Sequence, residues 1–220
     1  MRKIRLITGL LMIVFSLTVY SKNEYNIENL KKNDLLIKET LEKCKKNQFT
    51  KKDEACINVQ KVQNELAREI WDKNKNEIKN RLVKLYSEID AGNFDNIFSE
   101  MPPKFLKFLS EQASMSEKDL KMVAKEVAKE AFDKYGARTE NDKKFKEIKV
   151  GRTSVGRTYA IISHKIRVSV NNEVINSEEY ILAFEDRGKW YSMSLNKNFF
   201  IIFEIYPDFE EIEFSPSYFE

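Results

Sequence analysis

Apolar side chains recur at helical spacing through the first half of the chain. They share one helix face over residues 35–44, behind Asn33 as an N-cap, and again over residues 53–91. Gly92 is a natural C-terminal stop for the second stretch. This longer stretch predicts either one continuous helix or two helices with a break around residues 73–75.

Two shorter helices are predicted further along the chain. Pro103 suits the first turn of one helix. Ser116 and Asp119 form an N-capping pair for the next helix, which is expected to end near Gly136. The side chains expected to reach the core from this last helix are Leu120, Val123, Val127 and Ala131.

After Asp142 the apolar spacing changes from helical to alternating, which predicts strands. Alternate positions of the first clear strand are His164, Ile166, Val168 and Val170. Asn171–Asn172 and Asp186–Gly188 are predicted as hairpin turns, and residues 189–195 close the meander. The strand between the turns presents one apolar face, formed by Tyr180, Leu182 and Phe184.

The stretch after the meander is rich in aromatic residues. It predicts a short apolar helix or a last strand, which Pro207 ends. Its aromatic side chains belong to the core or line a groove for a lipid or a partner, and they are Phe199, Phe200, Phe203 and Tyr206.

Residues 1–21 have the pattern of an export signal. A basic start is followed by an apolar run from Leu6 to Tyr20, which is short for a bilayer span of about 20 apolar residues. Val19 and Ser21 occupy the small-residue positions of a cleavage site after Ser21. We expect a cleaved signal peptide, a periplasmic or secreted protein, and no stable membrane span after cleavage. The alternative is an uncleaved N-terminal anchor.

Removal of this segment cancels the net charge of the chain. The full sequence holds 38 lysines and arginines against 35 aspartates and glutamates, and residues 1–21 contribute three of the basic residues. The remainder therefore lacks the surplus of positive charge that nucleic-acid binding requires. A nucleic-acid partner is not expected.

The two cysteines, Cys44 and Cys56, flank a polar, lysine-rich stretch between the first two predicted helices. In an oxidising compartment an even number of cysteines favours a disulfide. A structural zinc site would need further ligands, and the single histidine, His164, lies far away in the sequence. The spacing also differs from the Cys-x-x-Cys of redox enzymes. We expect a disulfide that staples a helical hairpin, with free thiols as the alternative.

Helices followed by an antiparallel meander predict an α+β fold. We expect a signal peptide over residues 1–21, a disulfide-stapled helical hairpin over residues 22–72, and an α+β domain over residues 73–220. In this last domain the helices would pack on a curved antiparallel sheet in a cone-like arrangement.

The hairpin contains an asparagine followed by paired leucines, a Leu-x-x-Cys-Lys run and a Cys-x-Asn, namely Asn33, Leu35, Leu36, Leu41, Cys44, Lys45, Cys56 and Asn58. Over residues 33–62 this pattern resembles the entry-exclusion lipoprotein family of conjugative plasmids. The resemblance implies an exported protein that blocks redundant plasmid transfer. The alternative is a small disulfide hairpin that serves as an N-terminal module in another kind of protein.

The order of elements over residues 77–206, with LYSEIDAGNFDNIFSEMPP between two helices, resembles the nuclear-transport-factor-2-like cone fold. Members of this superfamily include pocket enzymes, ligand binders and non-catalytic exported domains. Fold alone does not choose among these activities.

The candidate pocket residues on the predicted sheet are His164, Tyr180 and Trp190. His164 could act as a general base, but the sequence offers no obvious acidic partner for it. Glu178 and Glu179 are adjacent on a strand and point to opposite faces, so they cannot act as a carboxylate pair. No catalytic residue, metal site or cofactor is predicted.

Two classes of function remain. The first, which we favour, is a non-enzymatic, exported binding protein, exclusion-like or immunity-like, whose partner is an envelope protein or a small apolar ligand. The second is a small pocket enzyme, isomerase-like or dehydratase-like, that acts on an apolar small molecule. An apolar pocket with His164 or Tyr180 pointing inward beside a carboxylate would favour the enzyme. A pocket filled by side chains, or an exposed apolar patch, would favour the binding protein.

Overall fold

The computed structural model describes residues 24–134, 138–170, 173–196 and 199–218. The predicted signal peptide, residues 1–21, and the predicted turn at Asn171–Asn172 lie outside these ranges. The fold is α+β, as the sequence predicts, and the chain divides into two compact units. The first unit extends to residue 66 and includes residues 154–156, and the second comprises the rest. Within the described ranges, no helix combines the length and the apolar character needed to cross a membrane.

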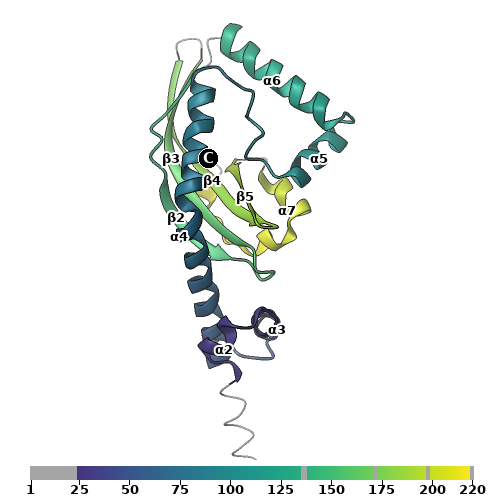
Figure 1. Cartoon of the computed structure of the whole chain (residues 1–220), viewed down its shortest axis with the longest axis vertical. Helices are drawn as coiled ribbons and strands as arrows, with labels where there is room; N and C mark the ends of the chain where they lie inside the picture. The colour runs from purple at the N-terminus through teal and green to yellow at the C-terminus, as the bar shows by residue number, and fades with distance from the viewer. Residues whose placement is uncertain (1–23, 135–137, 171–172, 197–198, 219–220) are drawn as a thin grey trace, which may run out of the picture. The chain divides into compact units, whose positions relative to one another are not determined.

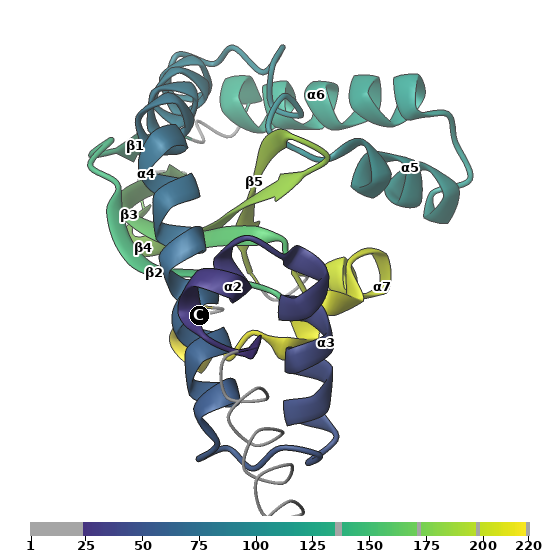
Figure 2. The same ribbon diagram turned by 60° about the horizontal axis from the view of Figure 1, so that its bottom comes forward.

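The first unit contains α2 (Ile27–Lys31), α3 (Asp34–Lys45) and the start of α4 (Glu54–Asp90). Asn33 caps α3, as predicted, because its side-chain oxygen accepts a hydrogen bond from the backbone N–H of Leu36 at 3.1 Å. Figure 2 shows α3 and the start of α4 as the two arms of a hairpin.

A small apolar cluster and a disulfide hold this hairpin together. The buried side chains of the cluster are Leu30, Ile37, Val59 and Val62. The predicted disulfide is confirmed, because Cys44 near the end of α3 is bonded to Cys56 near the start of α4, with Cα atoms 5.9 Å apart. Closing a loop of this length stabilises a fold by about 3 kcal/mol in the chain-entropy model.

The long apolar stretch forms one helix, α4, rather than two. Its predicted stop at Gly92 is confirmed, since Gly92 has a φ of 76° and its N–H closes the last turn on the carbonyl of Ile89 at 2.9 Å. A side chain would not fit here, because a Cβ at Gly92 would lie 2.6 Å from the ring of Phe132.

Among the described residues, five antiparallel strands form the sheet of the second unit. They are β1 (Arg138–Asn141), β2 (Lys146–Arg152), β3 (Thr158–Val170), β4 (Glu173–Asp186) and β5 (Lys189–Leu195). One edge of β3 pairs with β2 and then with β1, and its other edge pairs with β4, which in turn pairs with β5. Figure 1 shows that the long strands curve. The sequence does not predict β1, because its four residues, RTEN, include no apolar side chain.

The predicted hairpin turn between β4 and β5 is confirmed. Arg187 and Gly188 both have positive φ angles, of 55° and 77°, which a tight hairpin turn requires at both central positions.

The two faces of the sheet contribute to two apolar clusters. On one face, Ala160, Ile162, Ile181 and Ala183 pack with Trp71, Ile78 and Leu82 of α4. On the opposite face, Tyr159, Ile161, Leu182 and Phe184 pack with the C-terminal segment, residues 199–218, which includes the short helix α7 (Ile202–Ile205). Of the predicted aromatic stretch, Phe199 and Tyr206 are buried, whereas Phe200 is 52% exposed.

Two further helices, α5 (Pro103–Gln112) and α6 (Glu117–Lys134), follow α4 in the chain. Pro103 is the first residue of α5, as predicted. The predicted capping pair of α6 is also confirmed, because Asp119 N–H donates to Ser116 Oγ at 3.1 Å and Ser116 Oγ donates to the Asp119 carboxylate at 2.6 Å.

The predicted burial of the apolar stripe of α6 is wrong for Val123 and Val127, whereas Leu120 and Ala131 are half-buried. Val123 and Val127 are 42% and 61% exposed, and no residue of the helix is buried. The helix meets the rest of its unit on another side, where Phe132 packs edge-on against Phe94 at 5.9 Å between ring centroids. The helical spacing of apolar residues in α6 therefore shows which side of the helix is apolar. It does not show whether another element covers that side.

Candidate ligand-binding pocket

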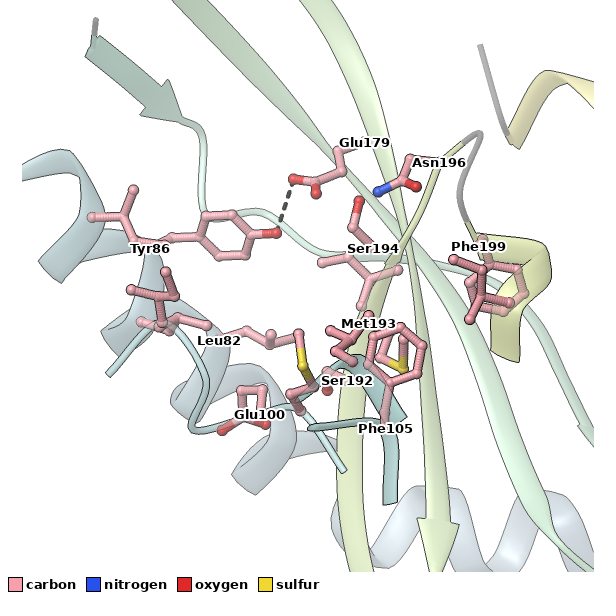
Figure 3. Close-up of a pocket in the computed structure, with 17 residues that line it drawn as sticks. Leu82, Tyr86, Glu100, Phe105, Glu179, Ser192, Met193, Ser194, Asn196 and Phe199 are labelled. Carbon is pink, nitrogen blue, oxygen red and sulfur yellow. Dashed lines mark hydrogen bonds between the residues drawn. The ribbon is translucent and has the colours of Figure 1, made fainter. Parts of the chain in front are cut away.

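A hollow of about 520 Å³ lies in the second unit, beside the strand pair β4–β5 (Figure 3). Most of its wall is apolar, formed by Leu82, Leu85, Ile89, Ile97, Met101, Phe105, Leu109, Ile181, Met193, Phe199 and Ile201. The polar side chains in the wall are Tyr86, Glu100, Glu179, Ser192, Ser194 and Asn196. This volume and this composition are typical of small-molecule sites in proteins.

Residue spacing along the helix and along the strands explains which side chains form the wall. One side of α4 contributes four residues at helical spacing, which are Leu82, Leu85, Tyr86 and Ile89. On β4, Glu179 and Ile181 are two residues apart, as are Ser192 and Ser194 on β5, so each pair faces the same side of the sheet.

Glu179 is the polar centre of this pocket. Its carboxylate accepts a hydrogen bond from the phenol of Tyr86 at 2.8 Å, which Figure 3 marks with a dashed line. The same oxygen lies 2.9 Å from Nε2 of His164, and Ser194 also donates to the carboxylate. The Glu179 side chain is 19% exposed.

These donors keep Glu179 ionised. Burial raises the pKa of its carboxyl, but the hydrogen bonds from His164, Ser194 and Tyr86 together outweigh burial and bring the pKa below the usual value of 4.5. Burial, with a smaller contribution from the Glu179 charge, raises the pKa of Tyr86 well above its usual value of 10.0. At neutral pH the pair is therefore a phenol donor and a carboxylate acceptor.

The second carboxylate in the wall, Glu100, has its own cation. Its Oε2 lies 2.9 Å from a guanidinium nitrogen of Arg81, which also donates to the backbone carbonyl of Trp190 at 2.9 Å. Burial raises the pKa of Glu100 more than Arg81 lowers it, so the net direction is upward. Among the described residues that line the pocket there is no lysine or arginine.

Ser192 contributes a hydroxyl without a partner. Its Oγ is buried and forms no hydrogen bond within the described residues, although its backbone N–H donates to the carbonyl of Glu100 at 2.8 Å. An unsatisfied buried hydroxyl is costly, but this oxygen has almost no accessible surface, so the structure does not present it to a ligand.

His164 lies behind this wall rather than in it. Its side chain is fully buried, between the rings of Tyr86 and Phe145 at centroid distances of 4.6 and 4.9 Å. Since the Glu179 carboxylate is an acceptor, Nε2 of His164 donates to it, and Nδ1 has no hydrogen-bond partner among the described residues. His164 thus positions the Glu179 carboxylate and does not face the hollow.

The expectation that His164 lacks an acidic partner is wrong, and the sequence held a signal that would have found Glu179. Residues of an antiparallel hairpin pair symmetrically about its turn. A two-residue turn at Asn171–Asn172 therefore pairs His164 with Glu179, which is the register that β3 and β4 adopt. Tyr86 and Ser192 carried no comparable signal, because they come from other elements.

The structure places the other two candidate residues outside the pocket. Tyr180 lies on the opposite face of the sheet, where its ring packs against Tyr218 at 4.6 Å. Trp190 is buried against Trp71 at 5.6 Å between ring centroids. Glu178 also points away from Glu179 and accepts a hydrogen bond from Ser163 Oγ at 2.6 Å.

No metal site or known relative adds to this description. Within the described ranges, no three histidine, cysteine or acidic side chains come together in a way that could hold a metal ion. Comparison of the chain with protein-family models, with curated proteins and with solved structures found no match. The two family resemblances stated from the sequence therefore stay predictions.

Proposed function

We propose that this protein is an exported, non-enzymatic binding protein that holds a small, largely apolar molecule in the pocket beside β4 and β5. The observation that carries the proposal is the hollow itself, about 520 Å³ lined mainly by aliphatic and aromatic side chains. Pockets of this size and lining bury most of the surface of a small ligand, and a few fixed polar groups orient it.

The protonation of the polar groups supports binding rather than catalysis. Efficient proton transfer needs a group whose pKa lies near the working pH. Glu179 has a lowered pKa, which makes it a weak base and a poor proton donor at neutral pH. Tyr86 has a strongly raised pKa and keeps its proton.

The pocket enzyme remains the second candidate, because one observation favours it. An apolar pocket does hold a carboxylate beside His164, which was the pattern expected of an isomerase-like or dehydratase-like enzyme. However, the imidazole is fully buried and is not among the residues that line the hollow, so it cannot contact a substrate directly.

Export is supported by two features. Disulfides persist in oxidising compartments, and Cys44 is bonded to Cys56. Residues 1–21 have the composition of a signal peptide.

The proposal predicts that a neutral apolar dye enters the pocket. We expect 1-N-phenylnaphthylamine to bind with an increase in fluorescence, and Leu85→Trp to abolish most of this increase, because the indole would fill part of the hollow that Leu85 lines.

The matched control is Leu35→Trp, the same substitution at a side chain that is 65% exposed and lies in the first unit. It should bind the dye like the unmodified chain. If the dye binds equally to all three proteins, its site is elsewhere and the proposal fails. The circular dichroism spectrum of each variant checks that the fold is kept.

A further inference from the structure

We propose that the ligand of this pocket is a cationic amphiphile, an apolar molecule with one ammonium-like group that pairs with the carboxylate of Glu179. This inference rests on the proposed binding function and adds the chemical class of the ligand. It follows from how charge and hydrogen-bonding capacity are distributed in the wall.

Within the described residues, no lysine or arginine forms an ion pair with the carboxylate of Glu179. Within the described residues its only ion-pair contact is with Nε2 of His164, and its other partners, Tyr86 and Ser194, are neutral donors. Glu100, by contrast, is paired with Arg81 at 2.9 Å. Burial of a carboxylate is costly where no permanently charged group contacts it, and a ligand that brings a positive charge would relieve this cost.

Glu179 also keeps capacity to accept another hydrogen bond. An ionised carboxylate offers about four acceptor sites. Three donors use it here, and two of them, Tyr86 and His164, converge on the same oxygen, Oε2. An ammonium group, which only donates, fits the site that is left. A ligand carboxylate would be repelled, because the described lining residues include two glutamates and no basic side chain.

The rest of the wall defines the other parts of the ligand. The aliphatic and aromatic side chains of α4 and α5, such as Leu82 and Phe105, suit an apolar body. The predicted ligand therefore has a cationic head and an apolar body.

Three probes that differ only in their head group test this inference on the full chain. They are 4-phenylbutylamine, 4-phenylbutan-1-ol and 4-phenylbutyrate, whose affinities are measured by isothermal titration calorimetry at pH 7. We expect the amine to bind about tenfold more tightly than the alcohol, because the ammonium group adds a charge that attracts the Glu179 carboxylate, whereas the alcohol is neutral. The carboxylate should bind most weakly.

Glu179→Gln should remove the preference, so that the amine binds no more tightly than the alcohol. Glutamine keeps an oxygen that accepts from Tyr86 and His164, so the wall is preserved without its charge. The matched control is Glu178→Gln, next to it on β4 but on the opposite face, which should keep the preference.

The outcomes separate the two proposals. If none of the three probes binds, the proposed binding function fails. If they bind with equal affinity, or if Glu179→Gln still prefers the amine, the binding function stands and the cationic class of the ligand is overturned.

Discussion

At the scale of single residues, the property that matters most is the ionisation of Glu179. We predict that its carboxyl, followed by carbon-13 NMR in the full chain, titrates below 4.5, because hydrogen bonds from three side chains outweigh burial. The Glu179→Gln variant assigns the resonance. A midpoint near neutral pH would contradict this prediction and would favour a role in acid–base catalysis.

The lowered pKa of Glu179 also fixes the sign of its effect on stability. A carboxyl with a lower pKa in the folded than in the unfolded chain stabilises the fold above its unfolded pKa. That contribution is lost as the pH falls through the folded pKa. Glu179 therefore stabilises the fold at neutral pH and ceases to do so in acid.

The sequence predicts three candidate pocket residues, and only one of them lies beside the pocket. His164 is a candidate pocket residue without a predicted catalytic role, and it supports Glu179 from behind the wall. Trp190 and Tyr180 are the other two candidates, yet packing partners outside the pocket bury or cover them. Residue type alone cannot say which neighbour a side chain meets, because that depends on register and on other elements.

At the scale of elements, one ion-pair network joins the C-terminal segment to the sheet. Arg157, immediately before β3, donates at 3.0 Å both to Asp186 at the end of β4 and to Asp208 in the C-terminal segment. Tyr206 O–H adds a bond to Asp186 at 3.1 Å, and Thr153 O–H adds one to Asp208 at 2.8 Å. These contacts link segments that are distant in the sequence.

We predict that Arg157→Met lowers the free energy of unfolding by about 3 kcal/mol, because it leaves two largely buried carboxylates without this cation. Urea denaturation measures the change. The control is Arg167→Met, whose side chain is 56% exposed and whose ion pair with Glu140 spans 3.8 Å, and it should change stability by no more than about 0.5 kcal/mol. Equal losses in the two variants would contradict a special role for the network.

Element type and caps were the most predictable features, because they depend on residues near in sequence. Asn33, Gly92 and the Ser116–Asp119 pair mark their helix ends as expected. Burial was less predictable, as the exposed Val123 and Val127 of α6 demonstrate. Whether another element covers an apolar stripe depends on how other parts of the chain pack, and the sequence of the helix alone does not show this.

At the scale of the whole molecule, the α+β order was predictable, because the spacing of apolar residues changes from helical to alternating along the chain. The pocket was not predictable. The hollow needs side chains from α4, α5 and the strands β4 and β5 to meet without filling the space between them. Its existence depends on packing geometry, and no local pattern encodes it.

The first unit should depend on its disulfide more than the second unit does, because its buried cluster is small. We predict that replacing both Cys44 and Cys56 with serine speeds amide hydrogen exchange in α3 about a hundredfold, which corresponds to a loss of about 3 kcal/mol. Exchange in β3 and β4 should stay the same. Reduction of the unmodified chain should reproduce the effect, and unchanged protection of α3 in both cases would contradict the prediction.

The bridge between Cys44 and Cys56 has a consequence for how the protein responds to proteolysis. The residues between α3 and α4 include exposed lysines, Lys46, Lys51 and Lys52, which are cleavage points for trypsin-like proteases. A single cut there would not release a fragment, because the sulfur–sulfur bond spans the break. Clipped and whole molecules would migrate as one band on a gel until a reducing agent separates the pieces.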